Sequence, residues 1–212
     1  MTAAELFSNV YRNRCWGRQD GQQFFSGPGS HDPEIVGPYV SAVSEFLSGF
    51  DTPPRVTDLG CGDFNIGSRI RPHCGAYTAC DVVPELIRYN AERFAALKVE
   101  FRCINIVDEP LPAGEIAFVR QVLQHLSNVQ ITQIVRKLTA YRHLICTEHL
   151  PEASAFTPNL DHQAGEGIRF ERGSGVVLTA PPFNMRPSGQ RELCRVREYH
   201  GWIVTMAYEF SQ

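Results

Sequence analysis

The feature that most constrains the fold is an alternation, from residue 55 onward, of short apolar segments with segments whose apolar residues recur at helical spacing. Each short apolar segment has the length of one strand, and these segments are residues 55–61, 76–82, 99–105, 116–121 and 143–147. Helices are expected at residues 66–71, from Pro84 onward, and along the stripe of Ile131, Ile134, Val135 and Leu138. Strands that alternate with helices form βαβ units and a parallel sheet. The sequence therefore predicts an α/β fold with a doubly wound, mostly parallel sheet.

The residues before this alternation predict an N-terminal lid or helical extension, residues 1–50. The stretch Ser26-Gly27-Pro28-Gly29-Ser30 must be a loop, and Asp32-Pro33 after it is typical of a helix start. Apolar residues at helical spacing follow, although Gly37-Pro38 leaves the first turns of this helix open. We expect this extension to belong to the same domain as the sheet, because 212 residues fit one α/β domain.

The residues after the alternation differ from it in composition. Residues 151–190 are rich in Pro, Gly and Asn, and we expect an irregular segment over the carboxyl edge of the sheet. Residues 191–199 and 202–210 flank His200-Gly201, which predicts a C-terminal antiparallel hairpin.

Composition narrows the classes of partner. Hydrophobic residues make up 43% of the chain, charged residues 20%, and the formal net charge is −3, which argues against disorder and against nucleic acid as a partner. The first residues carry no signal-peptide pattern, and no apolar run approaches the ~20 residues of a membrane span. The seven cysteines form no C-x-x-C pair, which indicates reduced thiols rather than disulfides or zinc ligands. We predict a cytoplasmic protein without a membrane partner, and the sequence leaves the oligomeric state open.

A glycine turn closes the first predicted strand. The turn is Asp58-Leu59-Gly60-Cys61-Gly62, and its glycines let the backbone bend tightly and approach a ligand. Asp81 closes the second strand, where its carboxylate can accept hydrogen bonds from a ribose diol. Both features meet at the carboxyl ends of neighbouring strands, which predicts an adenosine site near the switch point of the sheet.

The same turn departs from the fingerprint of dinucleotide-binding proteins, G-x-G-x-x-G. Asn65 stands where the third glycine is needed, and Asp63 would repel a phosphate. An acidic turn suits a sulfonium cofactor, which carries no phosphate. A nicotinamide-dependent oxidoreductase remains an alternative, although the chain lacks a Tyr-x-x-x-Lys pair. A tight turn without any ligand is the other alternative.

The turn and the acid after it resemble the first motif and the ribose-binding acid of class I S-adenosylmethionine-dependent methyltransferases. The chain is also similar to a bacterial group of small methyltransferases, in stretches that include Trp16-Gly17, Cys61-Gly62-Asp63-Phe64-Asn65, Pro110-Leu111-Pro112 and Pro181-Pro182-Phe183-Asn184. The resemblance implies a Rossmann-like methyltransferase fold and S-adenosylmethionine as cofactor. The residues that it implies for the cofactor are Trp16, Ser26, Gly29, Asp58, Gly60, Cys61, Gly62, Asn65, Asp81, Val82, Asn105, Ile106 and Gln121.

The chain departs from that group at three strand ends. Asn105 stands where the group has Asp, although its amide oxygen could still accept a hydrogen bond from the adenine amino group. Gln121 replaces an acidic residue, and Glu148-His149 stand where the group has Thr. These departures leave the fold and the cofactor in place but allow a different methyl acceptor.

Candidates for the transfer itself follow the fourth and fifth strands. His125 and His149 are candidate general bases, because histidine titrates near neutrality and a base is needed when the acceptor loses a proton. Each could instead be a packing residue. Polar residues on the acceptor side could line the acceptor site, and these are Glu148, Asn159, Asp161, Arg169 and Arg172. We expect no metal, because the same loops carry too few carboxylates for a cluster.

The function that the sequence predicts is methyl transfer from S-adenosylmethionine to oxygen or nitrogen of a small molecule or glycoconjugate. A non-catalytic S-adenosylmethionine-binding protein is the second alternative, because Asn105 replaces an acid of the related group.

Overall fold

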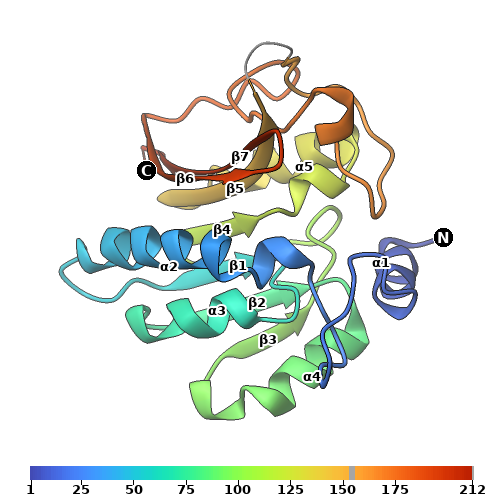
Figure 1. Ribbon diagram of the computed structural model, residues 1–212. Helices are drawn as coiled ribbons and strands as arrows, with labels where there is room; N and C mark the ends of the chain where they lie inside the picture. The colour runs from blue at the N-terminus through green and yellow to red at the C-terminus, as the bar shows by residue number, and fades with distance from the viewer. Residues whose placement is uncertain (153–155, 212) are drawn as a thin grey trace.

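Seven strands form one sheet in the computed structural model, which describes residues 1–152 and 156–211. Their order is β3-β2-β1-β4-β5-β7-β6. The strands are β1 (Val56–Leu59), β2 (Tyr77–Asp81), β3 (Glu100–Cys103), β4 (Ile116–Arg120), β5 (His143–Pro151), β6 (Gly189–Glu198) and β7 (Gly201–Glu209). The first five strands pair in parallel, whereas β7 runs antiparallel to both β5 and β6. The prediction of a mostly parallel sheet with a C-terminal antiparallel hairpin is confirmed (Figure 1).

Two strands differ in length from the prediction for physical reasons. β1 ends at Leu59, before the predicted residue 61, because Gly60 already adopts a left-handed conformation with φ of 82°. β5 continues to Pro151, beyond the predicted residue 147, because its last residues still pair with β7 and Pro151 lies opposite Gly201. A strand that has an antiparallel partner can extend beyond the end of its parallel neighbour.

Helices cover both faces of the sheet, as predicted. On one face, α2 (Pro33–Ser48) and α3 (Asn65–Ile70) pack on β1 and β4 through a core that includes Tyr39, Val43 and Phe118. On the other face, α5 (Asn128–Leu138) packs through Ile131 and Ile134. α4 (Pro84–Arg93) precedes β3, and the short 3-10 helices are η1 (Pro28–Ser30), η2 (Arg71–His73), η3 (Ala95–Leu97), η4 (Leu123–His125) and η6 (Phe170–Arg172).

The N-terminal extension contains two helices. α2 starts where expected, because Asp32 accepts a hydrogen bond from Glu34 N at 2.9 Å, and the helix continues through Pro38. α1 (Ala3–Arg12) was not predicted, although Thr2 and Glu5 form the capping box that could have indicated it.

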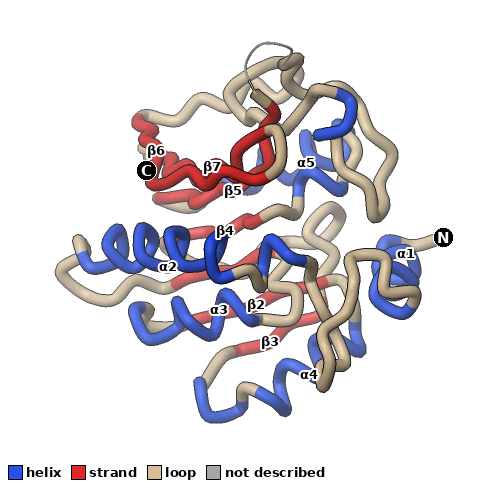
Figure 2. The backbone as a smooth tube through the Cα atoms, in the orientation of Figure 1, coloured by secondary structure: helices blue, strands red, loops and turns tan. Residues whose placement is uncertain are grey.

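The described part of the segment after β5 is mostly irregular and supplies part of the core on the α5 face. Val176, Leu178, Phe183 and Met185 are buried there beside α5. In Figure 2, the loop from this segment descends toward α1, and Trp16 Nε1 donates a hydrogen bond to Glu166 O at 3.1 Å. The N-terminal and the irregular segments therefore meet over one end of the sheet.

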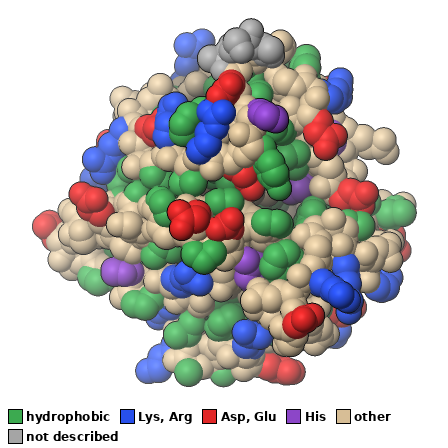
Figure 3. Space-filling view, in the orientation of Figure 1, with side chains coloured by type: hydrophobic (Ala, Val, Ile, Leu, Met, Phe, Trp, Pro, Cys, Tyr) green, Lys and Arg blue, Asp and Glu red, His purple; other side chains and the backbone are tan. Residues whose placement is uncertain are grey.

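The surface charges, the helices, the cysteines and the possible metal ligands can each be compared with the partners that the sequence suggested. On the face shown in Figure 3, Lys and Arg side chains are scattered among Asp and Glu. Within the described residues, no helix is both long and apolar enough to cross a membrane. All seven cysteines are free thiols. The described residues also include no group of three or more His, Cys, Asp or Glu side chains placed to hold a metal ion.

Candidate active site

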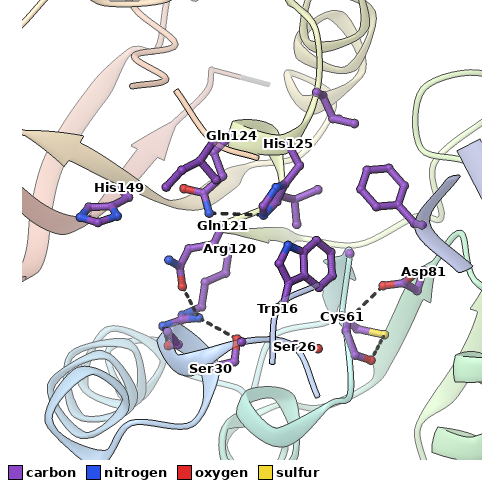
Figure 4. Close-up of a pocket in the computed structure, with 18 of the residues that line it drawn as sticks. Trp16, Ser26, Ser30, Cys61, Asp81, Arg120, Gln121, Gln124, His125 and His149 are labelled. Atoms are coloured by element: carbon purple, nitrogen blue, oxygen red, sulfur yellow. Dashed lines mark hydrogen bonds between the residues drawn. The ribbon is translucent and has the colours of Figure 1, made fainter. Parts of the chain in front are cut away.

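A cavity of about 690 Å³ lies at the carboxyl ends of β1, β2 and β4. The N-terminal segment, the segment after β5 and the turn between β6 and β7 complete its walls. Figure 4 places Asp81 and His149 at opposite sides of the view, with Trp16 and His125 between them. We call the part around Asp81 the glycine-turn end and the part around His149 the hairpin end.

The glycine turn is built so that other segments can pack on it. Gly60 and Gly62 have φ of 82° and 56°, which favours glycine at both positions. A Cβ on Gly60 would lie 2.4 Å from a methyl carbon of Val122, and a Cβ on Gly62 would lie 2.5 Å from Ser26 Oγ. The absent Cβ atoms therefore make room for neighbouring parts of the chain, which adds to the expected role of close approach to a ligand.

The N-terminal segment is clamped onto this turn through Ser26 and Asp63. Ser26 N donates to the Asp63 carboxylate and Asp63 N donates to Ser26 Oγ, both at 2.8 Å. Tyr11 Oη lies 2.9 Å from Ser26 Oγ, and His31 Nε2 lies 2.6 Å from the Asp63 carboxylate. The Asp63 carboxylate is thus bonded to protein groups and lies outside the described cavity lining.

Asp81 lines the cavity directly after the turn. Its two carboxylate oxygens accept hydrogen bonds from Gly62 N and Val83 N, both at 3.1 Å. Burial raises the pKa of Asp81 to about 6. Because each carboxylate oxygen has a second lone pair, Asp81 can still accept hydrogen bonds from a diol in the cavity.

Twelve of the thirteen residues expected to hold the cofactor line this cavity, and these are Trp16, Ser26, Gly29, Asp58, Gly60, Cys61, Gly62, Asp81, Val82, Asn105, Ile106 and Gln121. Asn65 is the exception, because its Nδ2 donates to Ser30 O at 2.6 Å and its side chain lies outside the described lining. Asn105 lines the cavity, but its Oδ1 already accepts from Val107 N at 3.0 Å and its Nδ2 donates to Asp108 at 2.6 Å. The Asn105 amide therefore also caps its own loop.

Arg120 is a cavity residue that the sequence did not single out. It is the one Lys or Arg among the described lining residues. Its Nη atoms donate to Gly29 O at 2.6 Å and to Ser30 Oγ at 3.3 Å, and its guanidinium lies 4.8 Å from the Tyr39 ring centroid. Its buried Nε has no partner among the described residues. Arg120 therefore places a positive charge in the cavity, where it favours the ionised forms of Asp58 and Glu198, with donor capacity to spare.

His125 lines the cavity between its two ends. Its ring centroid lies 4.9 Å from that of Trp16, and its Nδ1 lies 3.1 Å from Gly167 O. A carbonyl only accepts, so Nδ1 carries the proton and Nε2 presents a lone pair. Burial lowers the pKa of His125 to about 4, whereas the sequence suggested an ordinary histidine that titrates near neutrality. His125 is therefore neutral at pH 7.

His149 lines the hairpin end. It is 4% exposed and stacks on Phe170 with ring centroids 4.0 Å apart. Its Nδ1 lies 3.5 Å from the Glu198 carboxylate, and its Nε2 lies 3.4 Å from Glu198 O. Burial lowers the pKa of His149 and raises the pKa of Glu198. Glu198, at the end of β6, was not predicted as a site residue, because only the hairpin brings it beside β5.

The structure places Glu148 away from the cavity. Glu148 is buried outside the described cavity lining and accepts from Leu123 N and Gln124 N, both at 3.1 Å. Burial raises the pKa of Glu148 to about 8, while these two amides and the charge of Arg169 favour its ionised form. Arg169, fully buried, donates to Leu123 O at 3.2 Å and to Gln124 O at 3.1 Å. Glu148 and Arg169 together hold the loop that carries His125.

The other polar residues expected at the acceptor site also stabilise loops. Asn159 exchanges hydrogen bonds with the backbone of Val177, at 2.8 and 2.9 Å. Asp161 accepts from Asn128 N at 2.8 Å, and Arg172 donates to Asp161 O at 2.9 Å. These three residues lie outside the described cavity lining. Their expected contact with an acceptor is therefore corrected to a structural role.

The sheet order and the position of the cavity define a class of fold, that of class I S-adenosylmethionine-dependent methyltransferases. The chain is similar to the N-methyltransferase NodS from Bradyrhizobium japonicum WM9 in complex with S-adenosyl-L-homocysteine, with 14% identity, a TM-score of 0.67 and coverage of 96% of this chain and 100% of NodS. It is also similar to the magnesium protoporphyrin IX methyltransferase ChlM from Synechocystis PCC 6803, with 14% identity, a TM-score of 0.62 and coverage of 96% and 94%.

A third similar structure is human N-acetylserotonin methyltransferase in complex with S-adenosylmethionine, with 16% identity and a TM-score of 0.60. The alignment covers 100% of this chain and 61% of the human protein. No protein-family model and no curated protein sequence matches the chain. The likeness at this identity establishes the fold, and the predicted Rossmann-like methyltransferase fold is confirmed.

Proposed function

We propose that the protein is an S-adenosylmethionine-dependent methyltransferase that acts on oxygen or nitrogen of a small molecule or glycoconjugate. One observation carries the proposal: a single cavity joins the glycine turn and Asp81 at one end to His125 and His149 further along. The first end suits the cofactor, and the second leaves room for an acceptor. The three similar structures are named as methyltransferases, and each contains S-adenosylmethionine or its product.

The lining residues fit this cofactor chemically. Asp81 offers acceptors for the ribose hydroxyls, and Val82 and Ile106 offer apolar surface for the adenine. Arg120, with its unpartnered Nε, supplies a cation for the α-carboxylate. A single cation suits a carboxylate better than a pyrophosphate, which favours this cofactor over a dinucleotide.

The chemistry that the cofactor supplies is a methyl group on a positively charged sulfur. The protein then has to hold the acceptor atom in line with that methyl group and exclude water, which can supply several kcal/mol. In this proposal the N-terminal segment, residues 1–50, closes over the cofactor, and residues 151–190 shape the acceptor side. A reducing compartment such as the cytoplasm suits the seven free cysteines.

Thermal unfolding of the protein by scanning calorimetry, with S-adenosylhomocysteine and in parallel with NAD, tests the cofactor. At 100 times its dissociation constant, S-adenosylhomocysteine should stabilise the fold by ~2.7 kcal/mol, which raises the melting temperature by several degrees. NAD should leave the melting temperature unchanged. Stabilisation by NAD alone would replace the proposal with a nicotinamide-dependent oxidoreductase. Cofactor binding without transfer to any acceptor would favour a non-catalytic binding protein.

A further inference from the structure

The hairpin end of the cavity presents hydrogen-bond acceptors with spare capacity. Gln124 is 6% exposed, lines the cavity, and has no partner for its Oε1 among the described residues. The contacts of His149 with Glu198, at 3.4 and 3.5 Å, are longer than well-formed hydrogen bonds and leave both groups incompletely satisfied. Figure 4 shows the Gln124 amide between His149 and His125. A ligand with N–H or O–H donors would satisfy these acceptors.

Among the described residues that line the cavity, carboxylates outnumber cations. Three glutamates among the described residues line the cavity: Glu198 lies beside His149, Glu171 follows Phe170, and Glu166 lies beside Trp16. Arg120, the one arginine of the described lining, donates to Gly29 O and Ser30 Oγ, and its positive charge favours the ionised form of Glu198. The ionised Glu198 carboxylate attracts a cation that comes into contact with it and repels a carboxylate or phosphate.

Aromatic side chains line the same cavity. Trp16 borders it from the N-terminal segment, Phe170 from η6, and Tyr199 from the turn between β6 and β7. The stacking of Phe170 on His149 fixes the plane of the imidazole. Aromatic faces attract ammonium groups and accommodate sugar or aromatic rings, so their presence agrees with the charge balance.

We propose that the methyl acceptor is an amine, bound at the hairpin end as an ammonium group between Gln124, His149 and Glu198. This proposal rests on the proposed methyltransferase function and assigns its substrate class. Gln124 Oε1 and the Glu198 carboxylate accept hydrogen bonds from the ammonium group. His149 takes one of its protons, and the resulting imidazolium is stabilised by the Glu198 carboxylate.

The bonds and charges of this step balance. After the proton has moved to His149, the lone pair of the neutral amine attacks the methyl carbon. A nitrogen–carbon bond forms while the carbon–sulfur bond breaks and its electron pair stays on sulfur. The products are a methylated ammonium, a neutral thioether and protonated His149, which returns its proton to water. No oxidant, reductant or metal is needed.

The experiment measures binding of matched probes to the full chain saturated with S-adenosylhomocysteine. The probes are benzylamine, benzyl alcohol and benzoate, and glucosamine, glucose and glucuronate, each titrated by calorimetry. We expect each amine to bind at least tenfold more tightly than its carboxylate partner, because one charged hydrogen bond is worth about tenfold or more. Glu198→Gln should reduce this preference about tenfold, and Gln124→Leu should weaken amine and alcohol binding together.

Glu192→Gln is the matched control, because Glu192 lies on the same strand but is exposed and paired with Arg195 outside the described cavity lining. This variant should keep the preference of the wild type. The proposal is overturned if the carboxylates bind as tightly as the amines, if neither amine binds, or if Glu198→Gln leaves the preference unchanged. S-adenosylhomocysteine binding is measured first in each variant, so a failure of the cofactor proposal is distinguished from a failure of the amine proposal.

Discussion

Replacing Gly62 by alanine tests whether the N-terminal clamp closes the cofactor site. The new Cβ would lie 2.5 Å from Ser26 Oγ, and a residue with a side chain would have to keep a φ of 56°. The left-handed backbone costs about 1–2 kcal/mol. Displacing Ser26 also breaks its side-chain bonds to Asp63 N and Tyr11, at about 1 kcal/mol each. We expect a loss of about 3–4 kcal/mol in the free energy of unfolding and weaker binding of S-adenosylhomocysteine.

Gly21→Ala is the matched control for this experiment. Gly21 has φ of 79°, but no atom lies within 4 Å of the position of its Cβ, so the control carries the backbone strain without the clash. Urea denaturation gives the free energy of unfolding for both variants, and calorimetry gives their affinity for S-adenosylhomocysteine. Equal destabilisation of the two variants, with unchanged affinity in both, would refute the idea that the clamp holds the cofactor site closed.

Three further predictions concern single side chains. Asp81→Ala should weaken S-adenosylhomocysteine binding by roughly tenfold to a hundredfold, because a charged hydrogen bond contributes about this much to affinity. Titration calorimetry measures the affinity, and an affinity equal to that of the wild type would mean that the ribose does not bind at Asp81. Because the pKa of His125 is lowered from 6.5 to about 4, stability should fall as the pH drops through that window, and His125→Gln should remove this dependence in urea titrations at a series of pH values. Arg169→Met should cost about 3–5 kcal/mol, because it removes buried hydrogen bonds to Leu123 O, Gln124 O and Leu126 O at about 1 kcal/mol or more each, and an unchanged melting temperature would contradict this role.

The sequence predicted the sheet and the glycine-turn end well, because both depend on local patterns. Strand and helix periodicities fix the βαβ units, and the ends of parallel strands necessarily meet at one edge, so Gly60, Gly62 and Asp81 were found together. Asn65 was wrong as a lining residue because its side chain bonds the N-terminal segment, a contact that spans 35 positions in the sequence.

The hairpin end was harder to predict for a physical reason. Glu148 follows the predicted fifth strand, as a site residue often does. In the structure β5 continues to Pro151, and alternation along it turns Glu148 toward the backbone of η4 while its neighbour His149 faces the cavity. Glu198 reaches His149 only because β7 lies between β5 and β6 and the turn at Gly201 folds back. The irregular segment has no regular periodicity that relates the position of a residue in the sequence to the direction of its side chain. Asn159, Asp161 and Arg172 could therefore not be distinguished from residues that face a ligand.

The two edge strands of the sheet carry charged side chains that oppose edge-to-edge pairing. β3 carries Glu100 and Arg102, which pair with each other at 2.6 Å, and β6 exposes Arg195 and Arg197 beyond an irregularity in its register between Glu192 and Cys194. An open strand edge is a template for aggregation, and charged side chains and bulges oppose the addition of a further strand. The sheet can thus end at β3 and β6 without a partner, and neutral β-branched residues at these positions would turn either edge into a site for fibrous assembly.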